Sequence, residues 1–144
     1  MSESLKGRVV AIVGGGSGRD RAIAIALAEA GADIAIATER LVQEQEFATA
    51  SIANEVWAIG REQFSAVIDA REDGQLSSFL AEVRTRLGRL DAVVGAEIEA
   101  SDAAPMAILL TDKPGTATTG VRELVTIGMS DDELARAVLS ALGG

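Results

Sequence analysis

Short apolar runs alternate with longer segments of helical periodicity along most of the chain. The runs lie at residues 8–13, 33–38, 65–68 and 90–94. Apolar runs of this length, bounded by glycine or polar residues, predict strands that are buried on both faces. The longer segments lie at residues 20–30, 40–59 and 73–87, and a glycine directly follows each of them. These segments predict helices, because glycine commonly ends a helix.

The alternation of strands and helices predicts the fold class. Strands joined by crossover helices lie parallel, and such crossovers are right-handed in nearly all proteins. We therefore expect one α/β domain over residues 1–144, a doubly wound parallel sheet in a three-layer α/β/α arrangement. Residues 1–98 hold its βαβαβαβ core, with the expected strand order 3-2-1-4.

The pattern is less regular after Gly95. Residues 99–129 form an irregular insert, with candidate strands at Met106–Leu110 and Val121–Ile127 that extend the sheet beside the fourth strand. A capping box, Ser130-Asp131-Asp132-Glu133, then begins a helix over residues 130–142. The apolar stripe of this helix is Leu134, Val138 and Leu142. An apolar stripe that is left uncovered usually packs against another chain.

Composition excludes several kinds of chemistry. The 144 residues include no Cys, His or Tyr, which excludes disulfides, thiol nucleophiles, Cys/His metal sites and Ser-His triads within this sequence. Lys and Arg number 13 against 22 Asp and Glu, so the net charge is −9. This charge is a poor match to nucleic acid or to anionic membranes. We predict no metal site, because no spacing of carboxylates indicates one.

Targeting signals are also missing from the pattern. No apolar run approaches the roughly 18 residues that a membrane helix needs. Residues 1–7 lack an apolar signal core, and Glu3 stands where a signal peptide carries positive charge. We therefore expect a cytoplasmic protein with no membrane partner.

A glycine-rich turn, Val13-Gly14-Gly15-Gly16-Ser17-Gly18, separates the first strand from the first helix. Such a turn lets backbone amides approach a phosphate, and the helix N-terminus adds partial positive charge. A tight strand-to-helix turn also needs glycine for structural reasons alone. The candidate cofactor-binding residues here are Gly14, Gly16, Ser17, Gly18 and Arg19.

Residues 13–32, VGGGSGRDRAIAIALAEAGA, resemble the T-G-x-x-x-G-I-G cofactor loop and following helix of the short-chain dehydrogenase/reductase family. The resemblance continues through residues 33–36, 66–69 and 87–94, and residues 130–144 resemble the family's fifth helix. It implies a Rossmann-like fold, truncated relative to the family. In the family the fifth and sixth helices of two subunits form a bundle, and the sixth has no counterpart here. The resemblance therefore implies that the helix at Ser130–Leu142 forms an interface in a homo- or hetero-oligomer. It also implies NAD(P) as the candidate cofactor and oxidoreductase chemistry through a Tyr-x-x-x-Lys acid/base pair.

The chain departs from the family pattern at expected cofactor contacts. Asp20 replaces the last glycine of the loop, and it either modifies the phosphate site or caps the helix in place of an anion. Thr38 stands where the family's acidic residue implies NAD. Arg40 either reaches the 2′-phosphate of NADP or begins a solvated helix. Asp69 matches the family's adenine-contacting Asp, or is a turn residue at a strand end.

The catalytic residues that the resemblance implies have no counterpart here. Tyr is absent and Lys6 and Lys113 are the lysines, so the sequence holds no Tyr-x-x-x-Lys pair. Loss of a general acid typically slows a reaction by a factor of about 10² to 10⁴. We therefore predict no catalytic residue and a non-catalytic pseudo-enzyme or partner subunit. The alternative is an NAD(P)-binding oxidoreductase subunit whose acid/base residue comes from another chain.

Overall fold

The computed structural model describes residues 4–96, 98, 105–113, 115 and 121–143. The strands are β1 (Val9–Val13), β2 (Asp33–Ala37), β3 (Gln63–Ala66), β4 (Ala92–Gly95), β5 (Met106–Thr111) and β6 (Val121–Val125). The helices are α1 (Gly18–Glu29), α2 (Gln43–Ile59), α3 (Gln75–Leu87) and α4 (Asp131–Ala141). Each predicted strand and helix is therefore present, and the third strand begins at Gln63 instead of Ser65.

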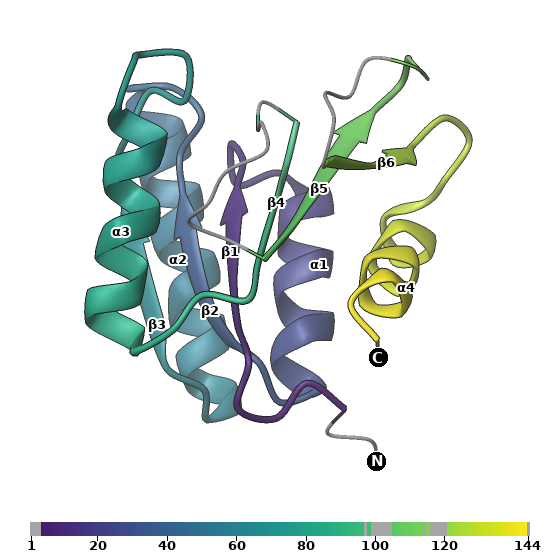
Figure 1. Cartoon of the computed structure of the whole chain (residues 1–144), viewed down its shortest axis with the longest axis horizontal. Helices are drawn as coiled ribbons and strands as arrows, with labels where there is room; N and C mark the ends of the chain where they lie inside the picture. The colour runs from purple at the N-terminus through teal and green to yellow at the C-terminus, as the bar shows by residue number, and fades with distance from the viewer. Residues whose placement is uncertain (1–3, 97, 99–104, 114, 116–120, 144) are drawn as a thin grey trace.

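The strands form one six-stranded sheet in the order β3-β2-β1-β4-β5-β6 (Figure 1), and every pairing in it is parallel. Strand β1 is central, because Val13 pairs with Ala37 of β2 and with Gly95 of β4. The predicted order 3-2-1-4 is confirmed. Both candidate strands lie beyond β4 as predicted, so part of the expected irregular insert belongs to the sheet.

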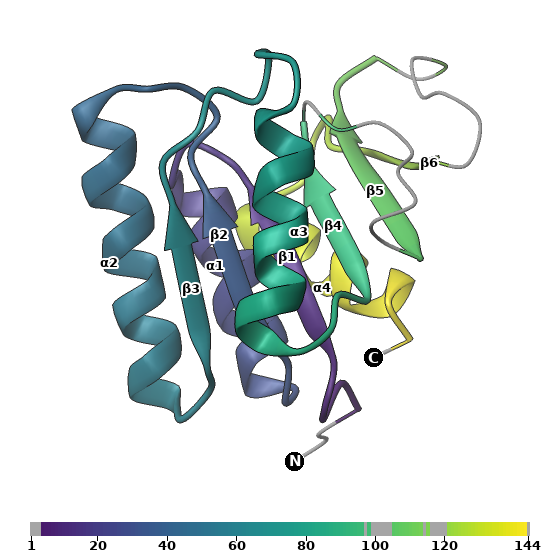
Figure 2. The ribbon, with the colours of Figure 1, turned by 60° about the vertical axis from the view of Figure 1, so that its left-hand side comes forward.

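Helices cover both faces of the sheet, which gives the predicted three-layer, Rossmann-like fold. Helices α1, α2 and α4 lie on one face and α3 lies on the other (Figures 1 and 2). Successive side chains of a strand point to opposite faces. Val10 and Ile12 of β1 accordingly join the core beneath α1, whereas Ala11 and Val13 join the core beneath α3. None of the described helices is long and apolar enough to cross a bilayer.

The C-terminal helix α4 packs against α1 within the same chain (Figure 1). Leu134, Val138 and Leu142 are 2%, 0% and 4% exposed, and all belong to the core on that face. The expectation that this stripe lacks cover is therefore wrong. Strands β5 and β6 widen the sheet and carry the chain to a position from which α4 reaches α1. An uncovered stripe therefore no longer supports assembly through the Ser130–Leu142 helix, and the oligomer itself stays a prediction.

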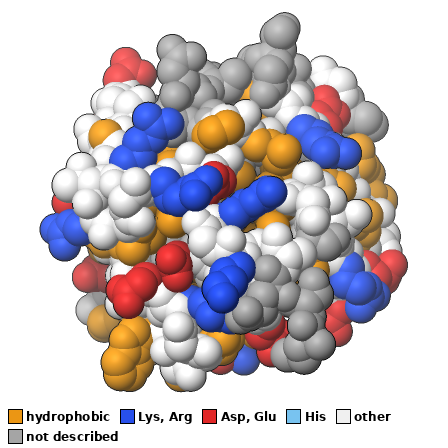
Figure 3. Space-filling view, turned by 60° about the horizontal axis from the view of Figure 1, so that its bottom comes forward, with side chains coloured by type: hydrophobic (Ala, Val, Ile, Leu, Met, Phe, Trp, Pro, Cys, Tyr) orange, Lys and Arg blue, Asp and Glu red, His pale blue; other side chains and the backbone are white. Residues whose placement is uncertain are grey.

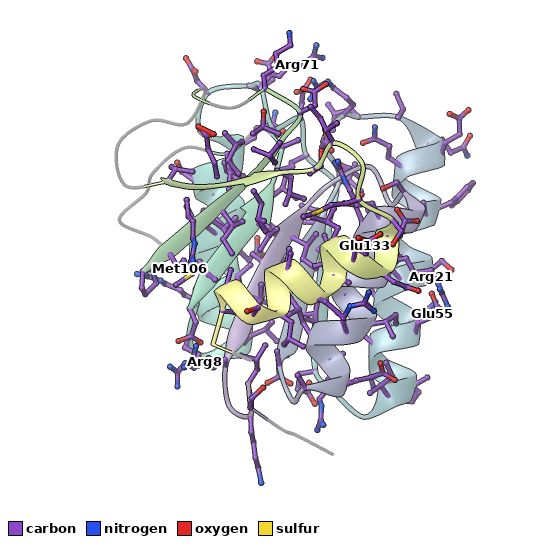
Figure 4. The ribbon with its side chains drawn as sticks, turned by 90° about the vertical axis from the view of Figure 1, so that its right-hand side faces the viewer. Arg8, Arg21, Glu55, Arg71, Met106 and Glu133 are labelled. Carbon is purple, nitrogen blue, oxygen red and sulfur yellow. The ribbon has the colours of Figure 1, made fainter. Side chains whose placement is uncertain are left out.

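Arginines bond to the carbonyl groups at the C-terminal ends of two helices. The Arg61 Nε–H donates to the carbonyl of Ala28 in α1 at 2.8 Å, and an Arg8 Nη1–H donates to that of Leu142 after α4 at 2.9 Å. Figure 4 shows Arg8 at this end of α4. Positive charge is favourable there because helix dipoles leave negative partial charge at C-termini. Lys and Arg gather near the middle of the face in Figure 3, which brings forward the side where β1 begins. Arg8 and Arg61 therefore act as caps at the C-terminal ends of α4 and α1.

Candidate functional site

The turn between β1 and α1 holds a carboxylate that is bonded to the turn's own amides. Oδ2 of Asp20 accepts from the backbone N–H groups of Gly16 and Ser17 and from the Ser17 hydroxyl, each at 3.1 Å. Ser17 is the N-cap of α1, and Asp20 is its partner in a capping box. Asp20 is 2% exposed. The capping interpretation of Asp20 is therefore observed, with Ser17 as the N-cap residue itself.

Three glycines of this turn make room for three different parts of the same chain. A Cβ atom at Gly14 would overlap the Asp20 carboxylate, and one at Gly16 would overlap Ala48 of α2. Gly16 also has a φ of 79°, a conformation that is costly for residues with a Cβ. A Cβ atom at Gly18 would lie 2.9 Å from Oδ2 of Asp131, at the start of α4. Close packing thus accounts for these glycines without a phosphate.

The turn as it stands does not fit the pyrophosphate of a dinucleotide. A phosphate bound at a helix N-terminus is held by backbone N–H groups, and those of Gly16 and Ser17 already donate to Asp20. A phosphate charge about 4 Å from this carboxylate would be repelled by roughly 4 kcal/mol at an effective dielectric constant of 20. Cofactor binding by Gly14, Gly16, Ser17 and Gly18 would therefore require the Asp20 side chain to leave the turn.

Thr38 directly follows β2, and its side chain bonds to the backbone of Ile68, just after β3. Its hydroxyl donates to the carbonyl of Ile68 at 2.7 Å and accepts from the Ile68 N–H at 2.8 Å. Thr38 is 0% exposed. The structure thus places this candidate ribose contact inside the fold, where its hydroxyl is bonded to the neighbouring backbone.

Asp69 lies just past β3 and is held by two arginines. Its Oδ2 lies 3.3 Å from Nη2 of Arg71, and its Oδ1 accepts from the Arg71 backbone N–H at 2.9 Å. Nη1 of Arg40 lies 3.9 Å from Oδ1, so the structure brings the candidates Arg40 and Asp69 together. The hydrogen bond from the Arg71 side chain, followed by that from its backbone, lowers the pKa of Asp69 below its usual value. Figure 4 shows Arg71 at this end of the molecule.

A cavity of about 380 Å³ lies where the carboxyl ends of several strands meet. Its lining residues come from the start of α1, from the last residues of β5 and from the chain after β2, β4, β5 and β6. They are Arg19, Glu39, Ala96, Leu110, Thr111, Asp112 and Thr126. Ligands of open parallel sheets bind at this edge, beside the point where strand order reverses. That point falls between β1 and β4.

Arg19 lines this cavity and has one buried donor without a partner among the described residues. The donor is its Nε–H. A buried N–H without a partner costs about 1–3 kcal/mol, so such groups are rare unless a ligand or water satisfies them. Because this Nε has no solvent-accessible surface, a ligand in the cavity could reach Arg19 only elsewhere on its side chain.

The sequence predicts only Arg19 among the cavity's lining residues. Thr111, Asp112 and Thr126 lie at or after the ends of β5 and β6, in the segment that the sequence pattern predicts to be an irregular insert. A signal for them exists, since residues that follow parallel strands converge at one edge of the sheet. No cluster of three or more acidic side chains in the described ranges could hold a metal ion.

Comparison with known proteins identifies relatives of this fold. A family model described as short chain dehydrogenase matches residues 8–105. Levodione reductase is 31% identical, with a TM-score of 0.53, over 62% of this chain and 34% of its own. Carveol dehydrogenase from Mycobacterium avium, in complex with NAD, is 28% identical, with a TM-score of 0.59, over 67% of this chain and 37% of its own.

A blue fluorescent protein from a metagenomic library, in complex with NADPH, is 26% identical, with a TM-score of 0.59, over 67% of this chain and 38% of its own. No curated protein matches the sequence. The chain thus spans 34% to 38% of the length of these three structures. Since the family model covers most of its residues, from β1 through β4, the chain belongs to the short chain dehydrogenase family.

Proposed function

We propose that this chain is a non-catalytic member of its family, which keeps the nucleotide-type fold as a scaffold or partner subunit. The observation that carries the proposal is the Asp20 carboxylate, which accepts hydrogen bonds from Gly16 and Ser17 in the turn where an anion would bind. The carboxylate supplies negative charge to the N-terminus of α1, so this helix end is stabilised without a cofactor.

A dinucleotide must displace this carboxylate or accept its repulsion. Displacement breaks the bonds to Gly16 and Ser17 and moves a buried acid, which weakens affinity for any phosphate at this turn. The contacts of Thr38 and Asp69 with other protein groups also weaken the affinity for a dinucleotide, because ribose and adenine would compete with them.

The test is a titration of the protein with NADH and NADPH, followed by nicotinamide fluorescence and by melting temperature. We expect no binding by the natural sequence up to about 1 mM, whereas binding tighter than about 100 μM would raise the melting temperature by mass action. Asp20→Gly is expected to bind at least one of the two nucleotides. Asp20→Asn removes the charge while keeping most of the side chain, and it is expected to bind more weakly than Asp20→Gly.

The matched control is Glu133→Gly, since Glu133 has the same position in the capping box of α4 that Asp20 has in α1. This variant should remain unable to bind nucleotide. Circular dichroism establishes that each variant is folded before titration. Tight binding of NADH or NADPH by the natural sequence would contradict the proposal.

The second candidate function is an NAD(P)-binding oxidoreductase subunit whose acid/base residue comes from another chain. It is favoured by two relatives that are complexes with NAD and NADPH, and by Asp69 at the end of β3 beside Arg40. It predicts nucleotide binding by the natural sequence, with turnover only after a companion chain is added. Cytoplasmic location and assembly with other chains belong to both candidates as predictions, and sedimentation velocity tests the assembly.

A further inference from the structure

The side of α2 that faces solvent carries two aromatic side chains. Phe47 is 64% exposed and Trp57 is 69% exposed. Gln43, Ala50 and Asn54 lie on the same side of the helix and are exposed as well. These five residues form what we call the outer seam of α2. Figure 2 shows α2 at the left edge of the molecule, so the outer seam lies on an outer surface of the fold.

The outer seam has the spacing of a helix-packing surface. Its residues follow one another at intervals of four, three, four and three, which is the spacing of the a and d positions in a coiled coil. The solvent side of a surface helix normally carries charge, but the charged residues of α2 lie outside the outer seam. They are Glu44, Glu46 and Glu55, and the last is bonded to Arg21 of α1 at 2.6 Å. The outer seam is thus a helix-packing surface that the described part of the chain leaves largely exposed.

The outer seam is complementary to a second copy of itself that runs in the opposite direction. Phe47 and Trp57 lie five positions before and after Ile52. Ala50 and Asn54 lie two positions before and after the same residue. A two-fold axis beside the middle of α2, with the two helices antiparallel, therefore brings Phe47 of each copy against Trp57 of the other. The smaller Ala50 and Asn54 lie between these contacts, where they let the helix axes approach to about 8–10 Å.

Charge also favours the antiparallel arrangement. Glu44 and Glu46 lie at the exposed start of α2, whereas Arg61 directly follows the glycine at its end. A parallel pair would place each acid beside its own copy, and like charges repel. An antiparallel pair places these acids near Arg61 of the second copy. Glu62 belongs to the return of the chain toward the sheet, since its N–H donates to Asp33 at 3.0 Å.

The exposed aromatic area indicates how strong such a pair would be. Enclosing an aromatic side chain removes about 150–250 Å² from water, so Phe47 and Trp57 would bury roughly 250 Å² per chain at their present exposure. Two copies would bury roughly 500 Å² through these side chains. The rest of the outer seam, with exposed Leu41 and Val42 before the helix, brings the total toward the roughly 1,000 Å² at the lower end of specific interfaces. The area therefore favours a weak, reversible dimer.

We propose that this chain forms a two-fold dimer in which the outer seams of two α2 helices pack antiparallel. Contacts between Phe47 and Trp57 hold the pair at both ends, and Ala50 and Asn54 allow the close approach between them. Helix α1 lies between α2 and α4 (Figure 1), so this interface differs from the one that the family resemblance implies. The dimer does not depend on nucleotide binding at the turn or on the proposed lack of catalysis.

Sedimentation velocity at about 5 to 500 μM protein, a range that brackets a Kd of roughly 10–100 μM, tests the dimer. We expect the sedimentation coefficient to rise with concentration from that of a monomer to that of a dimer. Trp57 is the single tryptophan of the chain, so its fluorescence reports on this surface. Its emission maximum should move to shorter wavelength over the same concentration range, because the indole loses contact with water.

Two substitutions test the outer seam, and both fall at exposed positions where folding should be preserved. Asn54→Glu places a charge at the centre of the interface and should raise the Kd by about 100-fold or more, since a buried charge without a partner is costly. Trp57→Ser removes an aromatic anchor and should raise the Kd by about 10-fold or more. Ile127→Ser is the matched control, because it removes an apolar side chain that is 68% exposed outside the outer seam. It should dimerise like the natural sequence.

The direction of the pair is tested with single cysteines, which the natural sequence lacks. In the antiparallel dimer the two copies of Gln43 are about 27 Å apart along the helix axes, at 1.5 Å per residue. The two copies of Asn54 are about 6 Å apart along the same axes. A short bis-maleimide is therefore expected to link Asn54→Cys chains into dimers and to leave Gln43→Cys chains unlinked.

Several results would overturn the proposal. A monomer at every concentration would show that the outer seam does not bind a second copy. Dimerisation of Asn54→Glu with the natural Kd, loss of the dimer in Ile127→Ser, or a dimer that leaves the Trp57 emission unchanged would place the interface elsewhere. Linking of Gln43→Cys as efficient as that of Asn54→Cys would contradict the antiparallel arrangement. The nucleotide titration judges the proposed function separately and does not bear on this interface.

Discussion

The first turns of α1 and α4 use the same local motif with different results. In α1, Ser17 is the N-cap and Asp20 bonds back to it, and in α4 Ser130 and Glu133 have the same roles. Asp20 is 2% exposed, whereas Glu133 lies in solvent (Figure 4). The buried acid gains an additional hydrogen bond from Gly16, in the turn before its helix. A capping box therefore fills an anion site only where the fold encloses it.

The two helices also differ in what holds them to the protein. The start of α1 is fixed by its turn, by β1 and by Asp131 close to Gly18. The start of α4 is exposed, and this helix is held by the apolar side chains that face α1. We therefore expect substitutions in the buried face of α4, and in the cap of α1, to lower the free energy of unfolding more than substitutions in the cap of α4.

The largest effect is expected from Leu134→Ala. Removal of a buried leucine side chain costs about 2–5 kcal/mol of unfolding free energy, since transfer energy is lost and a cavity remains. The measurement is urea unfolding at several protein concentrations. Ile127→Ala, at a residue that is 68% exposed, is the control and should change stability little. A loss that depends on protein concentration would indicate that α4 is an interface between chains after all.

Asp20→Ala is expected to have the next largest effect. It leaves the N–H groups of Gly16 and Ser17 without their acceptor in a buried turn, and we expect a loss of about 1–3 kcal/mol. Urea unfolding measures it, and added sulfate should recover part of the loss by binding at the opened helix N-terminus. Full stability of Asp20→Ala would contradict the assigned role of this carboxylate.

Glu133→Ala should have a smaller effect than Asp20→Ala. Its carboxylate accepts from the Ser130 N–H at 3.3 Å, and water replaces this bond easily at an exposed site. We expect about 0.5 kcal/mol or less from the same unfolding measurement. Equal losses for Glu133→Ala and Asp20→Ala would show that burial does not distinguish the two caps.

The smallest effect on stability is expected from substitution of Asp69, which lies just after β3 and pairs with Arg71. Because folding lowers its pKa, its contribution is present above the unfolded pKa of about 3.9 and is lost as pH falls through the lower folded value. Asp69→Asn should thus lower the melting temperature at neutral pH, with a difference that shrinks from about pH 4 downward. A difference that stays constant with pH would contradict the assigned ion pair.

Much of the fold was accessible from local pattern. The apolar runs identified the central strands, and the glycines that follow the helical segments identified where those helices end. The Ser130–Glu133 capping box likewise marked the start of α4. The candidate site was less accessible, because Thr38 and Ile68 are distant in sequence and meet only when β2 pairs with β3.

The pattern of residues was enough to predict the order of strands and helices, the parallel sheet and the presence of a carboxylate in a glycine-rich turn. Those features depend on side-chain periodicity and on neighbours a few residues apart. The folded chain was needed to show that Asp20 is buried, that α4 is covered by α1, and that Arg19 shares a cavity with Asp112. Burial and convergence depend on which chain segments lie side by side, and a local pattern does not contain that information.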